Sequence, residues 1–424
     1  MKKLVIIMII FTLISSITPA YADSLSLLAP SSILIDYDTG EVLYDNNSSM
    51  KTYPASTTKM MTAILAVENG NFSDVVTVDD EIVSLTKGSH VALEPGEQLT
   101  LEQLMYAMML PSANDAALAI AKHIGGTLDN FIRMMNEKAR VIGALDTNFV
   151  NPNGLHKDDH YSSAHDMALI GRYAMQYDVI REIVNTVTYE IPPTNKKTEA
   201  RYLKITNKLL FSTEKLNIDG KLVDAKYDGA SGIKTGYTPE AMNCLVSYAE
   251  RGGQRLIAAV MMADGNGNYC DTHTLLDYGF ENFQNRHIAF ANEYIDNVTV
   301  ENGELPYVAG ILDREIIYPV SNDTYALIQR EITLEENLTA PVEKGQILGK
   351  VDYLLNGKVI AGGNIISTAN IAADPMLKLS NRLISKWYYF VFGLMILMRL
   401  YVIQKRKFRR KYVRSARTFT SIRP

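Results

Sequence analysis

Cysteine is scarce in this sequence, since Cys244 and Cys270 are the only two in 424 residues. So few thiols exclude a disulfide-dense scaffold, and the sequence leaves open whether the two pair or stay as free buried thiols. Excess charge is lacking too, because the formal net charge is only −5, which argues against nucleic acid as a partner. The signatures HExxH, paired CxxC, GxSxG and the glycine-rich phosphate loops are also absent. These absences exclude the common sequence patterns of zinc peptidases, α/β-hydrolases and nucleotide-binding enzymes.

Long apolar runs are confined to the two ends of the chain. The first covers residues 4–14, follows two lysines and precedes the small residues Ala20 and Ala22. A charged start, an apolar centre and a small-x-small end are typical of a secretory signal peptide. We therefore expect residues 1–22 to be a signal peptide that is removed on export.

The second apolar run, residues 387–403, ends just before a strongly basic segment. It has 17 residues with one charge, Arg399, and nine Lys or Arg without any acid follow in residues 404–424. Because basic flanks stay in the cytoplasm, we expect a C-terminal membrane helix over 387–403 and a basic cytoplasmic tail. An amphipathic helix lying in the membrane plane is the alternative. Both ends together predict an exported protein anchored to the outer face of the cytoplasmic membrane.

Two different sequence patterns divide the body of the chain. Residues 23–285 begin with a hairpin pattern at 32–44, end with a strand pair over 243–262 and show helical spacing between them. This order predicts one α+β domain, in which late strands pair with early ones. Residues 292–377 instead hold short Val-, Ile- and Tyr-rich runs separated by Gly, Pro and Asn. That pattern predicts a small β-rich second domain.

Three short motifs follow one another along the first domain: S-T-T-K at 56–59, S-A-N at 112–114 and K-T-G at 234–236. Ser-x-x-Lys is a weak signal because four other matches occur, whereas Ser-x-Asn and Lys-Thr-Gly each occur once. Their order is that of active-site-serine penicillin-recognising enzymes. Among the five Ser-x-x-Lys matches, only Ser56 heads an apolar helical run, so we take Ser56 and Lys59 as candidate nucleophile and base.

Nucleophilic attack by serine is the chemistry that these residues suggest. A serine hydroxyl needs a nearby base, and residues three apart on a helix share a face, which brings Lys59 to Ser56. Burial, or a second cation such as Lys234, favours the neutral lysine that accepts a proton. Ser112 is the candidate proton relay, and Asn114 is the candidate group that orients a substrate amide.

The Lys-Thr-Gly motif has the pattern of an edge strand beside a groove. Lys234 and Thr235 offer a cation and a hydroxyl to a carboxylate. Gly236 has no side chain, so a substrate backbone could pair closely with the strand. We therefore expect this strand to bind the substrate.

With these motifs the chain resembles the serine-type D-alanyl-D-alanine carboxypeptidases, the low-molecular-mass penicillin-binding proteins. The resemblance extends over nearly all of residues 23–400. It implies a penicillin-recognising serine enzyme domain, with an antiparallel sheet and a helical subdomain, ahead of the β-rich domain. The matching segments are Y-P-A-S-T-T-K at 53–59, L-P-S-A-N-D-A-A at 110–117, F-V-N-P-N-G-L at 149–155, H-Y-S-S-A-H-D-M at 160–167 and G-I-K-T-G at 232–236.

The resemblance implies a carboxypeptidase that removes the terminal D-Ala from peptidoglycan stem pentapeptides. Ser56 would carry the acyl group and β-lactams would acylate it, Lys59 would accept its proton, and no metal or cofactor would be needed. The backbone N–H groups of Ser56 and Tyr237 would form the oxyanion hole. Tyr237 departs from the family pattern, because relatives often hold histidine there. The implied substrate-binding residues are Lys234, Thr235, Gly236 and Tyr237.

Other functions remain as alternatives. A D,D-endopeptidase uses the same chemistry on cross-linked peptides, and a β-lactamase shares the serine–lysine set but needs fast deacylation. A transpeptidase would need an acceptor site, and a non-catalytic wall-binding module predicts a decayed motif, of which there is none. His156, His160 and His165 lie near aspartates, but their spacing matches no zinc signature, so we expect no metal there.

Overall fold

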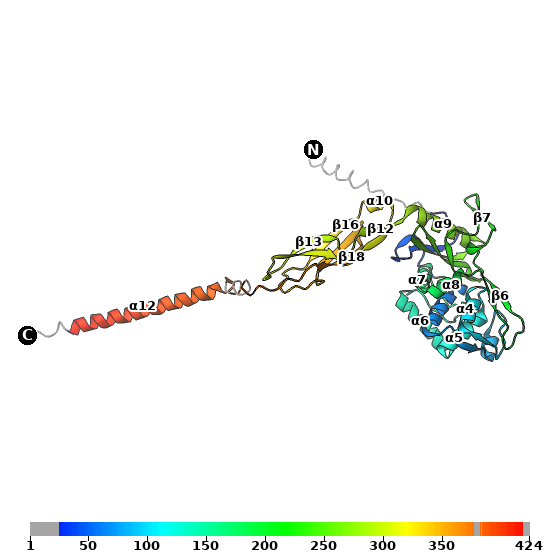
Figure 1. Cartoon of the computed structure of the whole chain (residues 1–424), viewed down its shortest axis with the longest axis horizontal. Helices are drawn as coiled ribbons and strands as arrows, with labels where there is room; N and C mark the ends of the chain where they lie inside the picture. Colours follow the sequence, from blue (N-terminus) through cyan, green and yellow to red (C-terminus); the bar gives the residue numbers. More distant parts are fainter. Residues whose placement is uncertain (1–24, 377–381, 383, 419–424) are drawn as a thin grey trace, which may run out of the picture. The chain divides into compact units, whose positions relative to one another are not determined.

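The computed structural model describes residues 25–376, 382 and 384–418, and the predicted signal peptide over 1–22 lies outside them. The chain divides after Gln284 into two units, which Figure 1 draws in blue to yellow-green and in yellow to red. The N-terminal unit holds two hydrophobic core clusters, and the C-terminal unit holds a third. Each unit therefore has a core of its own.

One five-stranded antiparallel sheet forms the frame of the N-terminal unit. The strand order is β2-β1-β11-β10-β9, so late strands pair with early ones, and β9 is an edge strand. This arrangement confirms the predicted α+β class and the predicted edge position of the Lys-Thr-Gly motif. The strands are β1 (Ser31–Asp36), β2 (Val42–Asn46), β9 (Ala230–Thr238), β10 (Met242–Arg251) and β11 (Gln254–Ala263).

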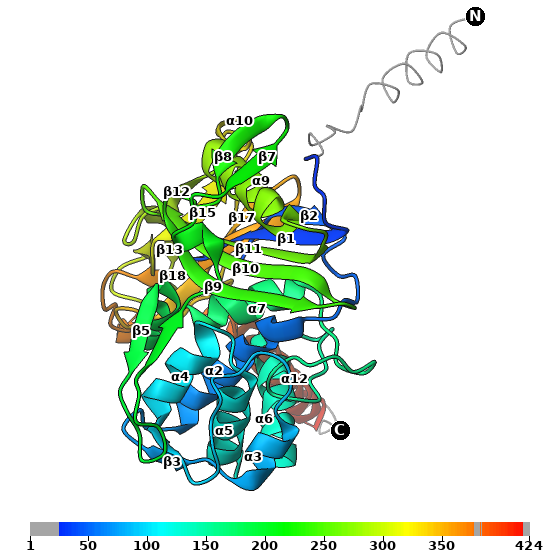
Figure 2. The same cartoon turned by 90° about the vertical axis from the view of Figure 1, so that its right-hand side faces the viewer.

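Helices cover both faces of this sheet (Figure 2). Successive side chains of a strand point to opposite faces, so Ile33 and Ile35 of β1 join the core under α7 and the helical subdomain, whereas Leu34 joins the core under α9. β1 is therefore buried on both sides. The two covering helices are α7 (Ala164–Ala174) and α9 (Gly267–Asn282).

Glycine allows each covering helix to approach the sheet closely. A Cβ atom added at Gly171 of α7 would lie 2.8 Å from Val246, and one added at Gly279 of α9 would lie 2.6 Å from Leu256. Helix α9 follows the last strand of the sheet, where the sequence pattern had suggested none. The prediction of helices only between the two strand groups was therefore incomplete.

A helical subdomain packs beside the sheet. Its central helix, α2, is buried through the eight residues from Lys59 to Ala66, so it has almost no solvent face. The other helices are α3 (Asp80–Leu85), α4 (Leu101–Met109), α5 (Asn114–Gly125), α6 (Leu128–Ile142) and α8 (Asp178–Asn185), and α2 itself spans Lys59–Asn69. The two-stranded sheets are β3 (Val75–Thr77) with β4 (Gln98–Thr100), β5 (Thr188–Ile191) with β6 (Arg201–Lys204), and β7 (Lys215–Ile218) with β8 (Lys221–Asp224).

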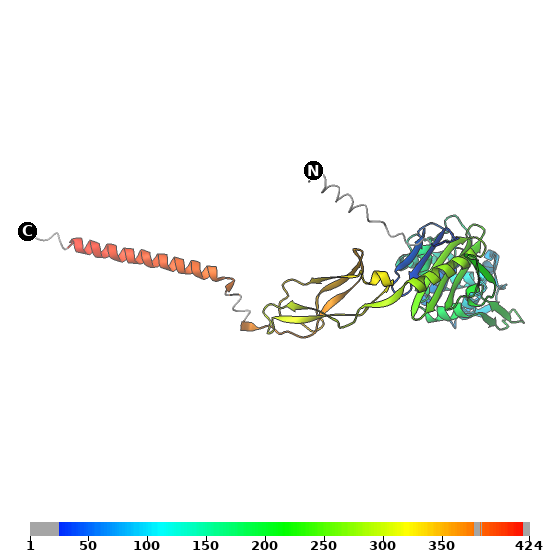
Figure 3. The same cartoon turned by 90° about the horizontal axis from the view of Figure 1, so that it is seen from above.

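The C-terminal unit is rich in strands, as predicted for this part of the chain (Figure 3). A five-stranded sheet has the order β13-β14-β18-β17-β16, and β12 pairs with β15. Its core is apolar and includes Val298, Leu312, Leu348 and Ile365. The elements are β12 (Gln284–Ala289), β13 (Tyr294–Thr299), β14 (Tyr307–Leu312), β15 (Ile316–Val320), α10 (Asn322–Tyr325), β16 (Gln329–Leu334), β17 (Ile347–Leu355) and β18 (Lys358–Ser367).

A single helix, α12 (Trp387–Thr418), ends the described chain. Its segment Trp387–Arg410 has a mean hydropathy of 1.4 over its most apolar window and is long enough to cross a membrane. The helix continues without a break from the apolar run into the basic segment, of which residues 419–424 lie outside the described chain.

Candidate active site

Ser56 lies on a tight turn at the start of α2. Residues Ala55–Thr58 form a 3-10 turn, and α2 begins at Lys59. A 3-10 turn superposes residues three apart, which brings the two side chains together more directly than the predicted α-helical spacing. Ser56 is half-buried and Lys59 is fully buried. The nucleophile candidate is therefore open to substrate, while its neighbouring amine is shielded from water.

The amine of Lys59 contacts three oxygen atoms. Its Nζ lies 2.9 Å from Ser56 Oγ, 2.7 Å from Asn114 Oδ1 and 2.6 Å from the carbonyl oxygen of Asn153. Two motifs therefore meet at one nitrogen atom. Sequence reasoning missed Asn153, since a carbonyl group is present in every residue and gives no motif signal.

Gly154 explains how the Asn153 carbonyl comes so close. The φ angle of Gly154 is +85°, and a Cβ atom there would lie 1.8 Å from the Ala55 carbonyl oxygen. Only glycine fits this contact between the 149–155 segment and the turn that carries Ser56.

Ser112 adopts a backbone conformation that serine rarely takes. Its φ angle is +66°, and this loop lies between Pro111 and the first residue of α5. Its Oγ is buried and has no hydrogen-bond partner in the described chain. A strained residue with an unpaired buried hydroxyl is typical of a functional site, because packing alone would not favour it.

Asn114 opens α5 and is held from two sides. Its Oδ1 accepts from Lys59, and its Nδ2 donates to the carbonyl of Lys87 over 2.6 Å. Its backbone N–H donates to the carbonyl of Ser89 over 2.7 Å. The segment before β4 therefore fixes the orientation of this amide.

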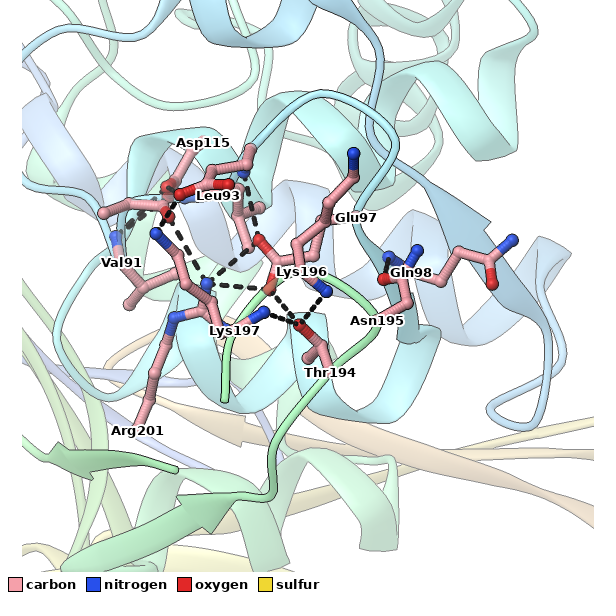
Figure 4. A network of polar contacts seen from close by, with 12 residues as sticks. Val91, Leu93, Glu97, Gln98, Asp115, Thr194, Asn195, Lys196, Lys197 and Arg201 are labelled. Carbon is pink, nitrogen blue, oxygen red and sulfur yellow. Dashed lines mark hydrogen bonds and ion pairs between the residues drawn. The ribbon is translucent and has the colours of Figure 1, made fainter. Parts of the chain in front are cut away.

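A polar network that includes Asp115 holds the same segment (Figure 4). The buried carboxylate of Asp115 accepts the backbone N–H groups of Val91 and Leu93, each over 3.1 Å. Since Asp115 follows Asn114 directly, both residues at the start of α5 hold the segment 87–93, each through two of its residues.

Glu97 connects this segment to the β5–β6 hairpin. Its side chain is fully buried and accepts from the Thr194 hydroxyl over 2.7 Å, the Glu94 N–H over 3.0 Å and the Arg201 guanidinium over 2.9 Å. Arg201 also forms an ion pair with the second carboxylate oxygen, at 2.8 Å. Charge-assisted bonds to a buried carboxylate are strong, so the hairpin and the segment form one connected body.

Strand β9 brings the third motif to the turn Ala55–Thr58, which carries Ser56. Lys234 is buried, and its Nζ donates to the carbonyl of Thr235 over 3.0 Å. A Cβ atom at Gly236 would lie 3.0 Å from the Pro54 carbonyl oxygen and 3.1 Å from the Ser56 nitrogen. Glycine at position 236 therefore allows the strand to contact the turn. The sequence had suggested another reason for this glycine, namely the close approach of a substrate backbone. Tyr237 beyond it is 63% exposed.

Burial lowers the pKa of both lysines. Desolvation and then the nearby charge of Lys234 hold the pKa of Lys59 well below its usual value, while the Asp115 carboxylate acts in the opposite direction. Desolvation lowers the pKa of Lys234 to about 7. Neither amine forms an ion pair with a carboxylate of the described residues. Lys59 is therefore set up to be neutral near Ser56.

The segment that contains His156, His160 and His165 contacts the turn that carries Ser56, through His160 and Thr58. Nδ1 of His160 accepts the Val150 N–H over 3.0 Å, so Nε2 carries the proton and donates to the Thr58 hydroxyl over 2.9 Å. Burial lowers the pKa of His160 to about 4, which keeps it neutral. No group of three or more His, Cys, Asp or Glu side chains suited to a metal occurs among the described residues. Cys244 and Cys270 are both free and buried.

Comparisons with known proteins identify the family of this chain. A family model described as D-alanyl-D-alanine carboxypeptidase matches residues 18–265. A second model, described as the C-terminal domain of penicillin-binding protein 5, matches residues 283–373. Together they cover the catalytic candidate residues and the β-rich unit.

Curated relatives are named after the activity that the first family model describes, D-alanyl-D-alanine carboxypeptidase. D-alanyl-D-alanine carboxypeptidase DacF of Bacillus subtilis is 31% identical over 369 residues, which is 85% of this chain and 90% of that protein. D-alanyl-D-alanine carboxypeptidase DacA of Haemophilus influenzae is 32% identical over 350 residues, with 80% and 84% covered. These relatives do not favour the endopeptidase and β-lactamase alternatives.

Solved structures show the same fold. Penicillin-binding protein 5 of Haemophilus influenzae has a TM-score of 0.68 and 29% identity over 82% of this chain and 99% of that chain. The DD-transpeptidase of Streptomyces K15 has a TM-score of 0.55 and 31% identity over 61% of this chain and all of that one. With the matched family model and relatives, this chain belongs to the D-alanyl-D-alanine carboxypeptidases, the low-molecular-mass penicillin-binding proteins.

Proposed function

We propose that Ser56 is the nucleophile by which this chain removes the terminal D-Ala from peptidoglycan stem pentapeptides. The observation that carries the proposal is the Lys59 amine, which lies 2.9 Å from Ser56 Oγ, is fully buried and has a lowered pKa. A neutral amine at this distance is a suitable general base for a serine hydroxyl.

In the first step, Ser56 Oγ attacks the carbonyl carbon of the penultimate D-Ala, and Lys59 Nζ takes the hydroxyl proton. The backbone N–H groups of Ser56 and Tyr237 stabilise the oxyanion that forms. Lys234 and Thr235 bind the terminal carboxylate of the peptide, and Asn114 orients the amide of the stem.

In the second step, the peptide bond breaks and D-Ala leaves. Its amine needs a proton, which passes from Lys59 through the Ser112 hydroxyl, whose buried Oγ has no hydrogen-bond partner in the described chain. Water then attacks the ester carbonyl of the acyl-enzyme and releases the shortened peptide. A β-lactam carbonyl would form the same ester with Ser56 and hydrolyse slowly, which would make β-lactams inhibitors.

Location is part of the proposal. Residues 387–403 of α12 anchor the protein in the cytoplasmic membrane, and the basic residues that follow stay in the cytoplasm. The segment Trp387–Arg410 is long and apolar enough to span a membrane, which supports the anchor. The basic residues after it and the predicted signal peptide are the grounds for the proposed orientation. The two units between these ends would then work on the outer face of the membrane.

Intact-mass spectrometry of the purified full-length chain after incubation with penicillin tests the proposal, with Ser56→Ala as the matched control. We expect a stable adduct on the wild type, none on Ser56→Ala, and release of D-Ala from a pentapeptide substrate. An unmodified wild-type chain with penicillin intact would overturn the assignment of Ser56. Consumption of penicillin without an adduct would indicate fast deacylation and a β-lactamase.

A further inference from the structure

Thr206 links the two sides of the active site, although none of the three motifs contains it. Its backbone N–H donates to the carbonyl of Leu110, two residues before Ser112, over 3.2 Å. Its side-chain Oγ1 lies 2.7 Å from Oγ1 of Thr235 in the Lys-Thr-Gly strand. Thr206 therefore spans from the Ser-x-Asn loop to the strand proposed to hold the substrate carboxylate.

The two hydroxyls form a pair that is open to solvent. Thr206 is exposed and Thr235 is half-buried, so neither hydroxyl needs the other to avoid an unpaired buried atom. In such a pair one hydroxyl donates to the other, and the second keeps its proton free. An incoming carboxylate has two oxygen atoms. Once the hydrogen bond between the two threonine hydroxyls breaks, each hydroxyl can donate to one of these oxygen atoms.

The charge next to this pair suits an anion. Lys234 lies behind Thr235, because its Nζ donates to the Thr235 carbonyl over 3.0 Å, and it makes no ion pair within the described chain. Hydrogen bonds to a charged group are about twice as strong as bonds between neutral groups. A pair of hydroxyls beside a buried cation therefore favours a carboxylate over a neutral amide.

Thr206 does not need its hydroxyl to stay in place. Its carbonyl accepts from the Tyr269 hydroxyl over 3.3 Å, and its N–H is already paired with Leu110. The next residue, Asn207, donates its side-chain amide to the carbonyl of Gly232 over 2.9 Å. The segment is thus held by backbone groups and by Asn207, which leaves the Thr206 hydroxyl available for a ligand.

We propose that Thr206 is a substrate-binding residue that, with Thr235, receives the terminal carboxylate of the D-Ala-D-Ala substrate. The inference rests on the proposed function, and it adds Thr206 to the residues by which the enzyme distinguishes a free peptide end from a blocked one. A carboxypeptidase needs this distinction, because its substrate ends immediately after the leaving residue.

The test compares two substrates on three variants of the full-length chain. The substrates are an N-acylated tripeptide that ends in D-Ala-D-Ala and the same peptide with a C-terminal carboxamide. Thr206→Val removes the hydroxyl at nearly constant shape, Thr206→Ser keeps it, and Thr213→Val removes a hydroxyl from an exposed loop position outside the motifs.

We expect Thr206→Val to raise KM for the carboxylate substrate about ten-fold or more, with little change in kcat, because one bond to a charged group is lost. The carboxamide substrate should be affected less than about two-fold, so the preference for a free carboxylate falls by a similar ten-fold. Thr206→Ser should keep the wild-type preference, and Thr213→Val should match the wild type.

Two results would overturn the inference while the proposed function stands. Equal losses with both substrates would mean that Thr206 acts only on the structure, and an unchanged KM would mean that it does not bind the carboxylate.

Rates of Ser56 acylation by penicillin and by its methyl ester, read from intact mass, provide a second comparison of a free carboxylate with a blocked one. A wild type that neither releases D-Ala nor forms an adduct would overturn the proposed function and this inference with it.

Discussion

Charge is buried at two places in the N-terminal unit, and the two places handle it in opposite ways. Beside the turn that carries Ser56, Lys59 and Lys234 are buried without a carboxylate partner in the described chain. Between the segment before β4 and the β5–β6 hairpin, the buried Glu97 forms an ion pair with Arg201 and accepts from several further donors. One region therefore leaves its amines without a carboxylate, and the other pairs its carboxylate with a cation.

The difference separates the buried groups that we propose for chemistry from those that hold the structure together. An unpaired buried ammonium group is unstable as a cation, so its pKa falls and it becomes a base. A paired and hydrogen-bonded group keeps its charge and loses much when its partner is removed. The predictions below use this contrast, because substitutions in the two regions should change stability with opposite signs.

The largest effect should come from Lys59→Met, which removes the proposed base and keeps the length of the side chain. We expect D-Ala release and acylation by penicillin to fall by about 1,000-fold or more, since no other amine lies at the Ser56 hydroxyl in the described structure. Stopped-flow acylation and single-turnover assays measure the loss. A variant that retains a tenth of the activity would show that Lys59 is not the base.

Removal of one partner from the paired region should cost the most stability. Arg201→Met leaves the Glu97 carboxylate buried with its charge unpaired, which we expect to lower the free energy of unfolding by about 3–5 kcal/mol. Calorimetric unfolding measures this change. The double variant Glu97→Gln with Arg201→Met is the matched control and should recover part of the loss, since it removes the isolated charge. If the single variant is as stable as the wild type, the contrast between the two regions fails.

Lys234→Met should instead raise the stability of the protein, because it replaces an unpaired buried amine by an apolar side chain of similar length. We expect acylation to fall about 100-fold while the unfolding free energy rises by about 2–4 kcal/mol at pH 6. Since the folded pKa lies below the unfolded one, the unfolded chain binds more protons between about pH 7 and 10.5, so wild-type stability rises with pH there. The advantage of the variant should therefore shrink towards pH 10. A stability gain that does not depend on pH would contradict this explanation.

The pH profile of acylation follows from the same pair of lysines. The proposed mechanism needs a neutral Lys59 together with a charged Lys234, so the rate should fall on the acid side as Lys59 becomes protonated. On the alkaline side it should fall above about pH 7, by about ten-fold per pH unit, as Lys234 loses its proton. Acylation rates from pH 5 to 10 measure both limbs. An alkaline limb that persists in Lys234→Met would assign it to another group.

The smallest effect should come from Tyr237→His, which restores the residue common in relatives. The side chain is 63% exposed, and the proposed contribution of Tyr237 comes from its backbone N–H. We therefore expect kcat/KM to change by less than about three-fold, because the oxyanion-hole donor stays in place. Steady-state kinetics on a pentapeptide measures it. A change above ten-fold would mean that the tyrosine side chain contacts the substrate.

Much of the candidate site was predictable because each motif is short and contiguous. A serine that heads an apolar run, with lysine three residues later, identified Ser56 and Lys59. The unique Ser-x-Asn and Lys-Thr-Gly matches identified the other two elements. The antiparallel sheet was predictable as well, since the strand patterns at both ends of the domain had to pair with one another.

The remaining parts of the site depend on contacts that no local pattern contains. Asn153 contributes a carbonyl group, which every residue has. Arg201 meets Glu97 across 104 residues of sequence, and Thr206 meets Thr235 across 29. Helix α9 follows the last strand, and its apolar residues have only a weak periodicity because the helix is buried on much of its surface. Such features require the packed structure.

Strand β9 has a consequence that concerns other protein molecules as well as substrate. An edge strand exposes unpaired backbone groups, and these invite a strand of a neighbouring chain. The proposed substrate-binding role of the Lys-Thr-Gly motif requires this edge to stay open. The same backbone groups that can pair with an extended peptide can therefore also pair with a strand of another protein molecule.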